Sequence, residues 1–184
     1  MSTERPWLAH YQEGIPADID HRQFPSIAAM LEDSFRRFAD RPAFSNFGKK
    51  LSYRQVDALS RQFAGYLTGK LKLQRGDRIA IMMPNCLQYP IALFGALRAG
   101  LVVVNVNPLY TARELKHQLT DAGATAILVL DNFGALLQQV IADTPIRHVI
   151  TTGLGDLLGF KGVLINAVLK HVKKMVPPYR LPGA

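Results

Sequence analysis

The most chemically suggestive stretch of this 184-residue sequence is residues 98–114, RAGLVVVNVNPLYTARE, where an apolar run stops abruptly on polar residues. Asn105, Asn107 and Tyr110 supply amide and phenol groups that can hydrogen-bond a ligand. They lie at the carboxyl end of a predicted strand over 101–106, and ligands of parallel α/β sheets bind at the carboxyl ends of strands. We therefore expect these three residues to form a loop on the substrate side of the sheet.

The same stretch also has a purely structural interpretation. Pro108 disfavours helical geometry at Asn107 and so ends the strand. Thr111 and Glu114 have the T-x-x-E spacing of a capping box, which predicts the start of a helix at this point. Both interpretations remain open for the two asparagines and the tyrosine.

A second candidate site lies in the basic tail. The net charge is +8, and residues 151–184 contribute five basic residues (Lys161, Lys170, Lys173, Lys174, Arg180) against Asp156 alone, a net of +4. We expect a helix over 160–176 with two faces. The apolar face holds Leu164, Ile165, Val168, Leu169, Val172, Met175 and Val176, and the polar face holds Asn166, Lys170, Lys173 and Lys174.

This helix has two interpretations. A basic amphipathic helix can lie on an anionic membrane, which would make Lys170, Lys173 and Lys174 membrane contacts. Alternatively, its apolar face packs on the domain. Nucleic acid is not an expected partner, because the basic residues lack interleaved aromatic residues and a recognisable reader module.

The sequence lacks motifs for phosphate binding, for a nucleophilic serine and for metal binding. The segment GYLTGKL at 65–71 has the wrong glycine spacing for a phosphate-binding Walker loop, and no G-x-S-x-G motif occurs. The five histidines are far apart, and the single cysteine, Cys86, allows neither an internal disulfide nor a cysteine zinc site. We therefore assign no catalytic, cofactor-binding or metal-binding residue.

The elements that would position these candidates alternate along the chain. Ser26 is a plausible cap for a first helix that ends before Pro42, with Ile27, Met30, Leu31, Phe35 and Phe38 at helical spacing. Two short strands turning at Gly48 follow, and then a second helix. From Arg75 to Thr151, strands and helices alternate every ~20–25 residues, a pattern that is typical of a parallel sheet. Residues 133–141 have the i, i+3, i+4, i+7, i+8 spacing of a helix.

Short β-branched runs at 101–106 and 126–130 indicate strands buried on both faces. The predicted fold is therefore α/β: a doubly wound, mainly parallel sheet with flanking helices, a small N-terminal hairpin and a basic amphipathic C-terminal helix. We divide the chain into an N-terminal arm (1–25), an α/β subdomain (26–155), and the amphipathic helix with a proline-rich linker (156–184).

Three features of the sequence indicate the cellular compartment of the protein. The first residues have no apolar segment of the signal-peptide type. The uncharged stretch 79–97 is interrupted by Pro84 and Pro90 and does not read as a membrane span. A single cysteine suits a reducing compartment. We expect a cytoplasmic protein with peripheral contact at the inner membrane surface.

Three long segments carry a resemblance to a known family: PAFSNFGKKLSYRQVDALSRQFAGYL, GDRIAIMMPNCLQYPIALFGALRAGLVVVNVNPLYTARELKHQLTDAGATAILVL and KHVKKMVPPYRLP. They resemble bacterial long-chain fatty-acid–CoA ligases of the adenylate-forming superfamily. LSYRQVDALS is similar to the first core motif of that superfamily and LRAGLVVVNVNP to the second. The string NPLYTARELKHQ points to the long-chain branch. The resemblance extends from about Phe24 to the last residue.

The resemblance implies a two-step reaction. A fatty acid attacks ATP to give acyl-adenylate and diphosphate, and the CoA thiol then displaces AMP, with Mg²⁺ as the metal. The phosphate loop, adenine motif, ribose-binding aspartate, hinge and lid lysine of that family have no match in the chain. We therefore expect the N-terminal part of a large domain that is inactive alone and binds neither ATP nor Mg²⁺. A homodimer is a further expectation, because such a part would expose apolar surface.

Two alternatives to the ligase interpretation stay open. The chain could be a stand-alone α/β module that binds a small molecule at its strand ends, since fold alone does not determine function. It could also be a membrane-surface module that acts through the tail helix.

Overall fold

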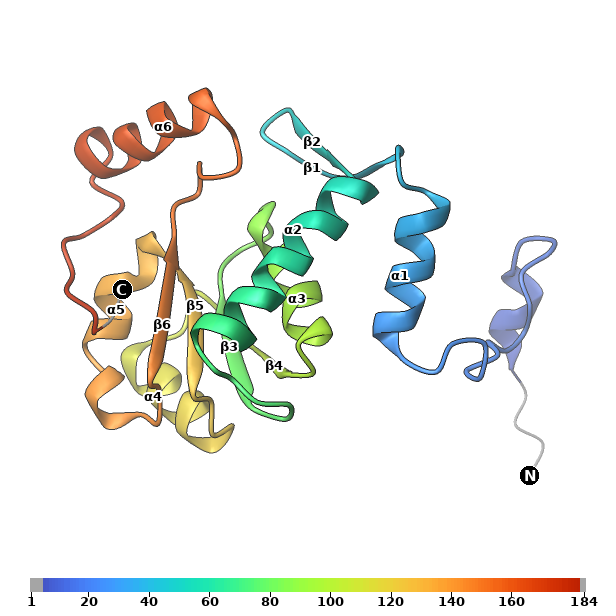
Figure 1. Ribbon diagram of the computed structural model, residues 1–184, viewed down its shortest axis with the longest axis horizontal. Helices are drawn as coiled ribbons and strands as arrows, with labels where there is room; N and C mark the ends of the chain where they lie inside the picture. Colours follow the sequence, from blue (N-terminus) through green and yellow to red (C-terminus); the bar gives the residue numbers. More distant parts are fainter. Residues whose placement is uncertain (1–4, 183–184) are drawn as a thin grey trace.

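Four parallel strands form the central sheet of this computed structural model, which describes residues 5–182 (Figure 1). The helices and strands, in chain order, are α1 (Ile27–Arg37), β1 (Pro42–Asn46), β2 (Lys49–Ser52), α2 (Tyr53–Gly65), β3 (Arg78–Met82), α3 (Gln88–Arg98), β4 (Val102–Asn105), α4 (Ala112–Asp121), β5 (Ala126–Leu130), α5 (Gly134–Gln138), β6 (His148–Thr152) and α6 (Phe160–Ala167). Short 3₁₀ turns are η1 (Pro6–His10), η3 (Asp131–Phe133) and η4 (Ile141–Asp143), and π-helical turns are η2 (Tyr66–Lys70) and η5 (Val168–Val172).

The strand order is β4-β3-β5-β6, so the chain changes direction across the sheet after β4. Ile79 of β3 stands opposite Val103 of β4 on one side and Ala126 of β5 on the other. Crossovers between parallel strands are right-handed, so connections that run in opposite directions put their helices on opposite faces. This arrangement confirms the predicted α/β, doubly wound sheet with flanking helices.

The two faces of the sheet alternate residue by residue. Ala80 and Met82 of β3 pack with buried leucines of α4 and α5. Ile79 of the same strand packs with residues of η2 and α3, and Ile81 packs with residues of α3. Both faces are therefore apolar, which is why the central strands read as continuous hydrophobic runs.

The expectation of strands buried on both faces is right for β5 and wrong for β4. All five residues of β5 are buried. In β4, Val102 is 48% exposed and Asn105 is exposed. β4 lies at the edge of the sheet and has a neighbouring strand on one side only, so its β-branched run reflects strand propensity more than burial.

Helices α2 and α3 pack closely because a glycine stands at their contact. A Cβ on Gly95 would lie 2.9 Å from the carbonyl oxygen of Ser60 and 2.8 Å from the Phe63 ring. Arg98, at the end of α3, pairs with Asp57 of α2 and lies 3.4 Å from Glu32 of α1. Together these contacts fix α1, α2 and α3 relative to one another.

The predicted hairpin is confirmed. Strands β1 and β2 pair antiparallel across a two-residue turn. Phe47 and Gly48 both have positive φ, 47° and 77°, as a type I′ hairpin turn requires.

The predicted helix over 133–141 is broken in the structure. Only Gly134–Gln138 is α-helical, between the 3₁₀ turns η3 and η4. Leu137 and Val140 are buried, so the apolar pattern identified the inward face correctly. The Thr144 hydroxyl donates to the Ile141 carbonyl at 2.8 Å, and this local bond accompanies the end of the regular turn structure.

The N-terminal arm extends from the sheet on the side of α1 (Figure 1). None of the residues 5–25 is buried, and Trp7 and Ile19 are 54% and 86% exposed. In α1, Phe35 is buried, whereas Ile27 and Met30 are 59% and 41% exposed. The apolar residues at helical spacing are therefore covered only in the later part of α1, where Phe35 packs with residues of α2 and α3.

Candidate functional site at the carboxyl edge of the sheet

A cavity of about 750 Å³ opens where β5 and β6 end. Its walls come from the loops after these strands, from α6 and η5, and from the chain that follows. The lining residues are Asp131, Asn132, Gly153, Leu154, Asn166, Leu169, Lys170, His171, Lys174, Val176, Pro177, Pro178 and Tyr179. The cavity thus occupies the edge of a doubly wound sheet at which ligands bind.

The loop after β6 is a tight, hydrogen-bonded turn. The Asp156 carboxylate accepts from the Gly153 N–H at 2.7 Å and from the Thr152 hydroxyl at 2.9 Å. Asn166 of α6 accepts from the Gly155 N–H and donates to Asp156, each at 2.8 Å. Asn166 therefore faces the domain, and it lines the cavity together with Lys170 and Lys174, three of the four residues expected on one polar face.

Two glycines let α6 approach this turn. A Cβ on Gly155 would collide with the backbone of Gly162, and a Cβ on Gly162 would collide with the Gly155 carbonyl. On the other side of the turn, the Gln88 amide of α3 donates to the Gly153 carbonyl at 2.7 Å, and Gln88 is buried. The floor of the cavity is consequently held by α3 and α6 together.

The chain after η5 returns to the sheet and closes the cavity. The Asn132 amide donates to the Met175 carbonyl at 2.9 Å, and the Tyr179 hydroxyl donates to Asp131 at 2.7 Å. Burial first, and then the adjacent Asp131, raises the pKa of Tyr179 to about 12. A Cβ on Gly134 would collide with the Tyr179 ring.

The described part of the expected proline-rich linker therefore packs on the domain. Leu181 also contacts the core between the sheet and helices α4 and α5. The Arg180 N–H donates to the Gln138 side chain and the Tyr179 ring lies against Gly134, so this segment runs beside α5. We refer to residues 175–181 as the returning segment.

The predicted tail helix is shorter than expected. Helical structure ends at Val172, Lys173 follows it, and Lys174 has a φ of +50°. Met175 and Val176 consequently lie outside the helix. The left-handed backbone conformation of Lys174 ends the helix before Pro177 and Pro178.

The apolar residues of the tail helix are divided between two sides. Gly162 is buried and Ile165, Val168 and Leu169 are partly buried. Phe160, Val163, Leu164 and Val172 are 64–91% exposed. The expected single apolar face is therefore wrong, because Leu164 and Val172 turn outward while Asn166 turns inward. We call Phe160, Val163 and Leu164 the outer strip of α6.

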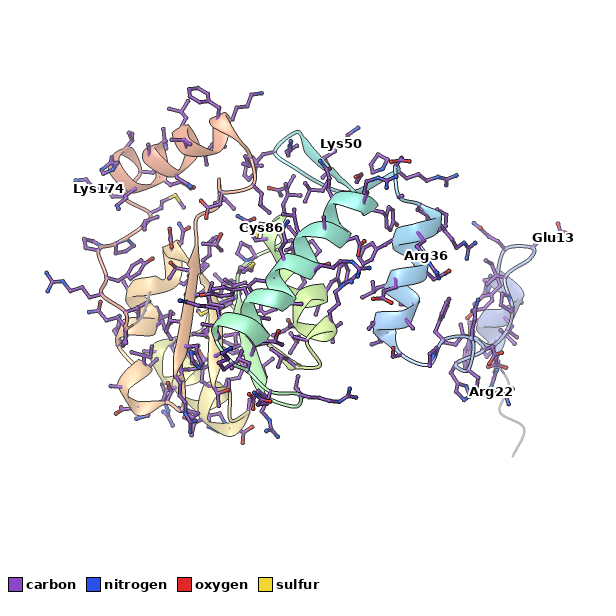
Figure 2. The ribbon with its side chains drawn as sticks, in the orientation of Figure 1. Glu13, Arg22, Arg36, Lys50, Cys86 and Lys174 are labelled. Carbon is purple, nitrogen blue, oxygen red and sulfur yellow. The ribbon has the colours of Figure 1, made fainter. Side chains whose placement is uncertain are left out.

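The three predicted membrane lysines are separated by the structure. All three are exposed, but Lys170 and Lys174 line the cavity and Lys173 does not. Figure 2 shows Lys174 at the end of the tail helix that lies away from the β1–β2 hairpin, on which Lys50 stands. His171 joins the two lysines in the wall of the cavity.

Asn105 is the last residue of the edge strand β4, Asn107 and Tyr110 follow it, and none of the three lines the cavity. Asn105 accepts from the Tyr89 hydroxyl at 3.0 Å, and Asn107 accepts from the Leu109 N–H at 3.0 Å. Tyr110 packs against the core. Each residue thus has a local structural partner, and its predicted role in a substrate-side loop stays a prediction.

The capping box at the start of α4 is confirmed. The Thr111 hydroxyl accepts from the Glu114 N–H at 3.4 Å, and the Glu114 carboxylate accepts from the Thr111 N–H at 2.8 Å. These bonds to Thr111 lower the pKa of Glu114.

Sequence reasoning selected Lys170 and Lys174 as site residues, but not the other polar side chains that form the cavity. Asp131 and Asn132 directly follow the most apolar strand, so the rule that selected the asparagines after β4 could also have selected them. Asn166 and Tyr179 gave no comparable signal, because their positions depend on how the tail folds back.

Comparison with known proteins shows the family. A model of the AMP-binding enzyme family matches residues 31–175. The chain belongs to the AMP-binding enzyme family. Members of similar sequence include the "Long-chain-fatty-acid--CoA ligase" of Yersinia pestis, 53% identical over 98% of this chain and 32% of its own length. The ligase of the same name from Bacillus subtilis is 36% identical over 93% of this chain and 30% of its length.

Solved structures of AMP-binding enzymes support the fold. A long-chain-fatty-acid-CoA ligase from Archaeoglobus fulgidus matches with a TM-score of 0.64 at 21% identity, over 77% of this chain and 30% of that protein. The apo structure of Mycobacterium smegmatis MbtA matches with a TM-score of 0.63 at 30% identity, over 67% and 24%. The chain spans about a third of the length of the curated AMP-binding enzymes that it matches.

Proposed function

We propose that this chain is the N-terminal part of a long-chain fatty-acid–CoA ligase that works in the cytoplasm. The observation that carries the proposal is the identity of about 50% to curated ligases of this name over 98% of the chain. The complete enzyme would join a fatty acid to ATP, release diphosphate, and then transfer the acyl group to CoA with loss of AMP. The part described above would supply one α/β layer of the large domain.

We derive no step through ATP or Mg²⁺ for these residues. Within residues 5–182, no group of three or more His, Cys, Asp or Glu side chains converges into a metal site. Adenylation needs backbone N–H groups and cations arranged around the phosphates. Of the cavity's polar side chains, Asn132, Asn166 and Asp131 are already engaged within the protein. The chain alone is therefore proposed to be inactive in adenylation.

ATP–diphosphate exchange with oleate tests both parts of this proposal. The 184-residue chain alone is expected to give no exchange above the protein-free blank. Joining it to the C-terminal two-thirds of the Yersinia pestis ligase is expected to restore oleate-dependent exchange and acyl-CoA formation. Exchange by the chain alone would overturn the inactivity, and an inactive, folded chimera would count against the ligase assignment.

We further propose that α6 contacts an anionic membrane. No helix among residues 5–182 is long and apolar enough to cross a bilayer. The outer strip of α6, with Phe160 91% exposed, lies on a tail that carries a net charge of +4. Apolar side chains flanked by lysines suit the interfacial region of an anionic bilayer.

Sedimentation with vesicles of phosphatidylglycerol and phosphatidylcholine tests this contact. Replacing Lys170, Lys173 and Lys174 by Glu is expected to abolish co-sedimentation. Lys49→Glu with Lys50→Glu, which reverses two charges against three in the tail, is the control on the β1–β2 hairpin and should retain most binding. Unchanged binding of the triple tail variant would refute the contact.

A homodimer is the remaining proposal about partners. It is supported by the exposed apolar residues of the arm and of the first turns of α1, which include Ile15, Ile19 and Ile27. Sedimentation velocity at increasing protein concentration tests it. A single monomeric species up to about 100 μM, where a specific dimer of micromolar affinity would be saturated, would exclude it.

A further inference from the structure

The cavity at the ends of β5 and β6 has polar groups whose bonds within the protein can be traced one by one. The Asn132 amide is bound to the Met175 carbonyl, and both polar atoms of the Asn166 amide are bound to the loop after β6. Asp131 accepts from the Tyr179 hydroxyl. The amides and the carboxylate of the wall are therefore occupied in shaping the cavity.

The cationic side chains differ from these groups. Between residues 5 and 182, Lys170 and Lys174 take part in no ion pair with an acidic side chain. Both line the cavity, with His171 beside them. The wall thus offers positive charge and spare N–H donors, which suit an anionic group.

The rest of the wall is apolar. It is formed by the side chains of Leu154, Leu169, Val176, Pro177 and Pro178 and by the ring of Tyr179. The volume of about 750 Å³ lies within the range of about 300–1,000 Å³ typical of small-molecule sites. Such a lining would bury a hydrocarbon chain rather than a hydrated ion.

We propose that this cavity binds an amphipathic anion, with the head group at Lys170 and Lys174 and the hydrocarbon part against the apolar wall. A long-chain carboxylate and a phosphate-bearing lipid share this chemistry. The free fatty acid is the first candidate, and that choice rests on the ligase function proposed above. The assignment of an anion with an apolar body rests on the lining alone.

The cavity is separate from the surface proposed to meet the membrane. Leu169 and Lys170 line the cavity, whereas the outer strip (Phe160, Val163, Leu164) is exposed. The two proposals share Lys170 and Lys174, so they are separated by substitutions in the outer strip, which does not line the cavity. A substitution in the outer strip should leave binding of a soluble amphiphile unchanged.

Isothermal titration calorimetry on the 184-residue chain tests the site. The probes are dodecanoate, dodecyl phosphate, dodecanol and inorganic phosphate, each below its critical micelle concentration where one exists. We expect saturable one-site binding of dodecanoate, dodecyl phosphate or both, and weaker binding of dodecanol and of inorganic phosphate. Tighter binding of dodecanoate would assign a free fatty acid, and tighter binding of dodecyl phosphate would assign a phosphate-bearing lipid.

The lysines provide a matched pair of variants. Lys170→Gln with Lys174→Gln is expected to weaken binding of the anionic probe about tenfold or more, because charge-assisted hydrogen bonds are lost. Lys173→Gln removes a neighbouring charge whose side chain does not line the cavity, and should change affinity less than about twofold, since a solvated charge outside the site is largely screened. Circular dichroism should show the same fold for all three proteins.

Three outcomes would overturn the proposal: no saturable binding of either anion, equal binding of dodecanol, or equal losses in the Lys173 variant and the double variant. Failure of the ligase function is recognised separately, because it is read from exchange by the chimera. Binding to the isolated chain needs neither ATP nor CoA.

Discussion

At the scale of single residues, Gly155 and Gly162 decide whether α6 can reach the turn after β6. The absence of a Cβ at each position permits a backbone contact that no other residue would allow. The same contact brings Asn166 within hydrogen-bond distance of Gly155 and Asp156. The wall of the cavity therefore depends on glycine at both positions.

Gly162→Ala is expected to lower the free energy of unfolding by about 1–3 kcal/mol, the usual cost of overpacking a tight contact. Urea denaturation followed by circular dichroism measures it, and amide exchange should rise first in α6. Gly69→Ala is the control, because a Cβ there meets nothing within 4 Å. Equal stability of the two variants would contradict the close packing of α6.

Tyr179 is a second residue whose effect can be measured, through the pH dependence of stability. Its pKa is raised to about 12 in the folded protein, mainly by burial and then by Asp131, against an ordinary value of 10.0. Folding therefore favours the neutral Tyr179 phenol. The stability that this neutral phenol contributes is present below pH 10 and is lost as the pH rises towards 12.

Tyr179→Phe is expected to cost about 1 kcal/mol at neutral pH, since it leaves the Asp131 partner without its hydrogen bond. Between pH 9 and 11, the stability of the wild type should fall more steeply than that of the variant. Urea titrations at both pH values measure the difference. Parallel pH dependence of the two proteins would exclude a structural role for the Tyr179–Asp131 bond.

At the scale of elements, two helices begin with capping boxes of different chemistry. Thr111, the N-cap of α4, pairs with the carboxylate of Glu114, and Ser52, the N-cap of α2, pairs with the neutral amide of Gln55. Removing either hydroxyl, by Thr111→Ala or Ser52→Ala, is expected to cost about 1 kcal/mol at pH 7.

The acid response should separate these two caps. The pKa of Glu114 is lowered from 4.5 by its bonds to Thr111. Its stabilising effect is thus present above that value and is lost as the pH falls below it. The cost of Thr111→Ala should shrink with acidification, whereas the cost of Ser52→Ala should stay constant. Thermal unfolding from pH 7 to pH 4 and below provides the measurement, and a constant Thr111→Ala cost would contradict the carboxylate cap.

Elements governed by local signals were predictable. A few neighbouring residues determine each of three features: the I′ turn at Phe47 and Gly48, the capping box at Thr111 and the apolar run of β5. The exposure of β4 and the inward turn of Asn166 were not predictable, because they depend on strand order and on the packing of α6. The cavity was missed for the same reason: its walls include residues 131–132 and 174–179, which lie more than 40 positions apart in the sequence.

At the scale of the whole molecule, the arm is nearly independent of the α/β subdomain. None of the residues 5–25 is buried, and the arm's own ion pair, Arg5 with Asp18 at 2.7 Å, stays within it. Deleting residues 1–20 is therefore expected to change the free energy of unfolding by less than about 0.5 kcal/mol, as is usual for surface changes. Urea denaturation followed by circular dichroism at 222 nm checks this.

The same deletion bears on self-association. If the arm forms the proposed dimer contact, its removal should abolish any concentration-dependent sedimentation while leaving the melting curve in place. Dimerisation that survives the deletion would place the contact elsewhere, for example on the outer strip of α6.

The position of Trp7 has a spectroscopic consequence. It is the only tryptophan in the sequence, and it lies half-exposed on the arm rather than in the core. Its emission will therefore change little when the sheet unfolds, although circular dichroism will report a full transition. A mismatch between these two signals would describe where the fluorophore stands and should not be taken as evidence of a folding intermediate. The same fluorophore becomes a selective reporter once anything binds to the arm.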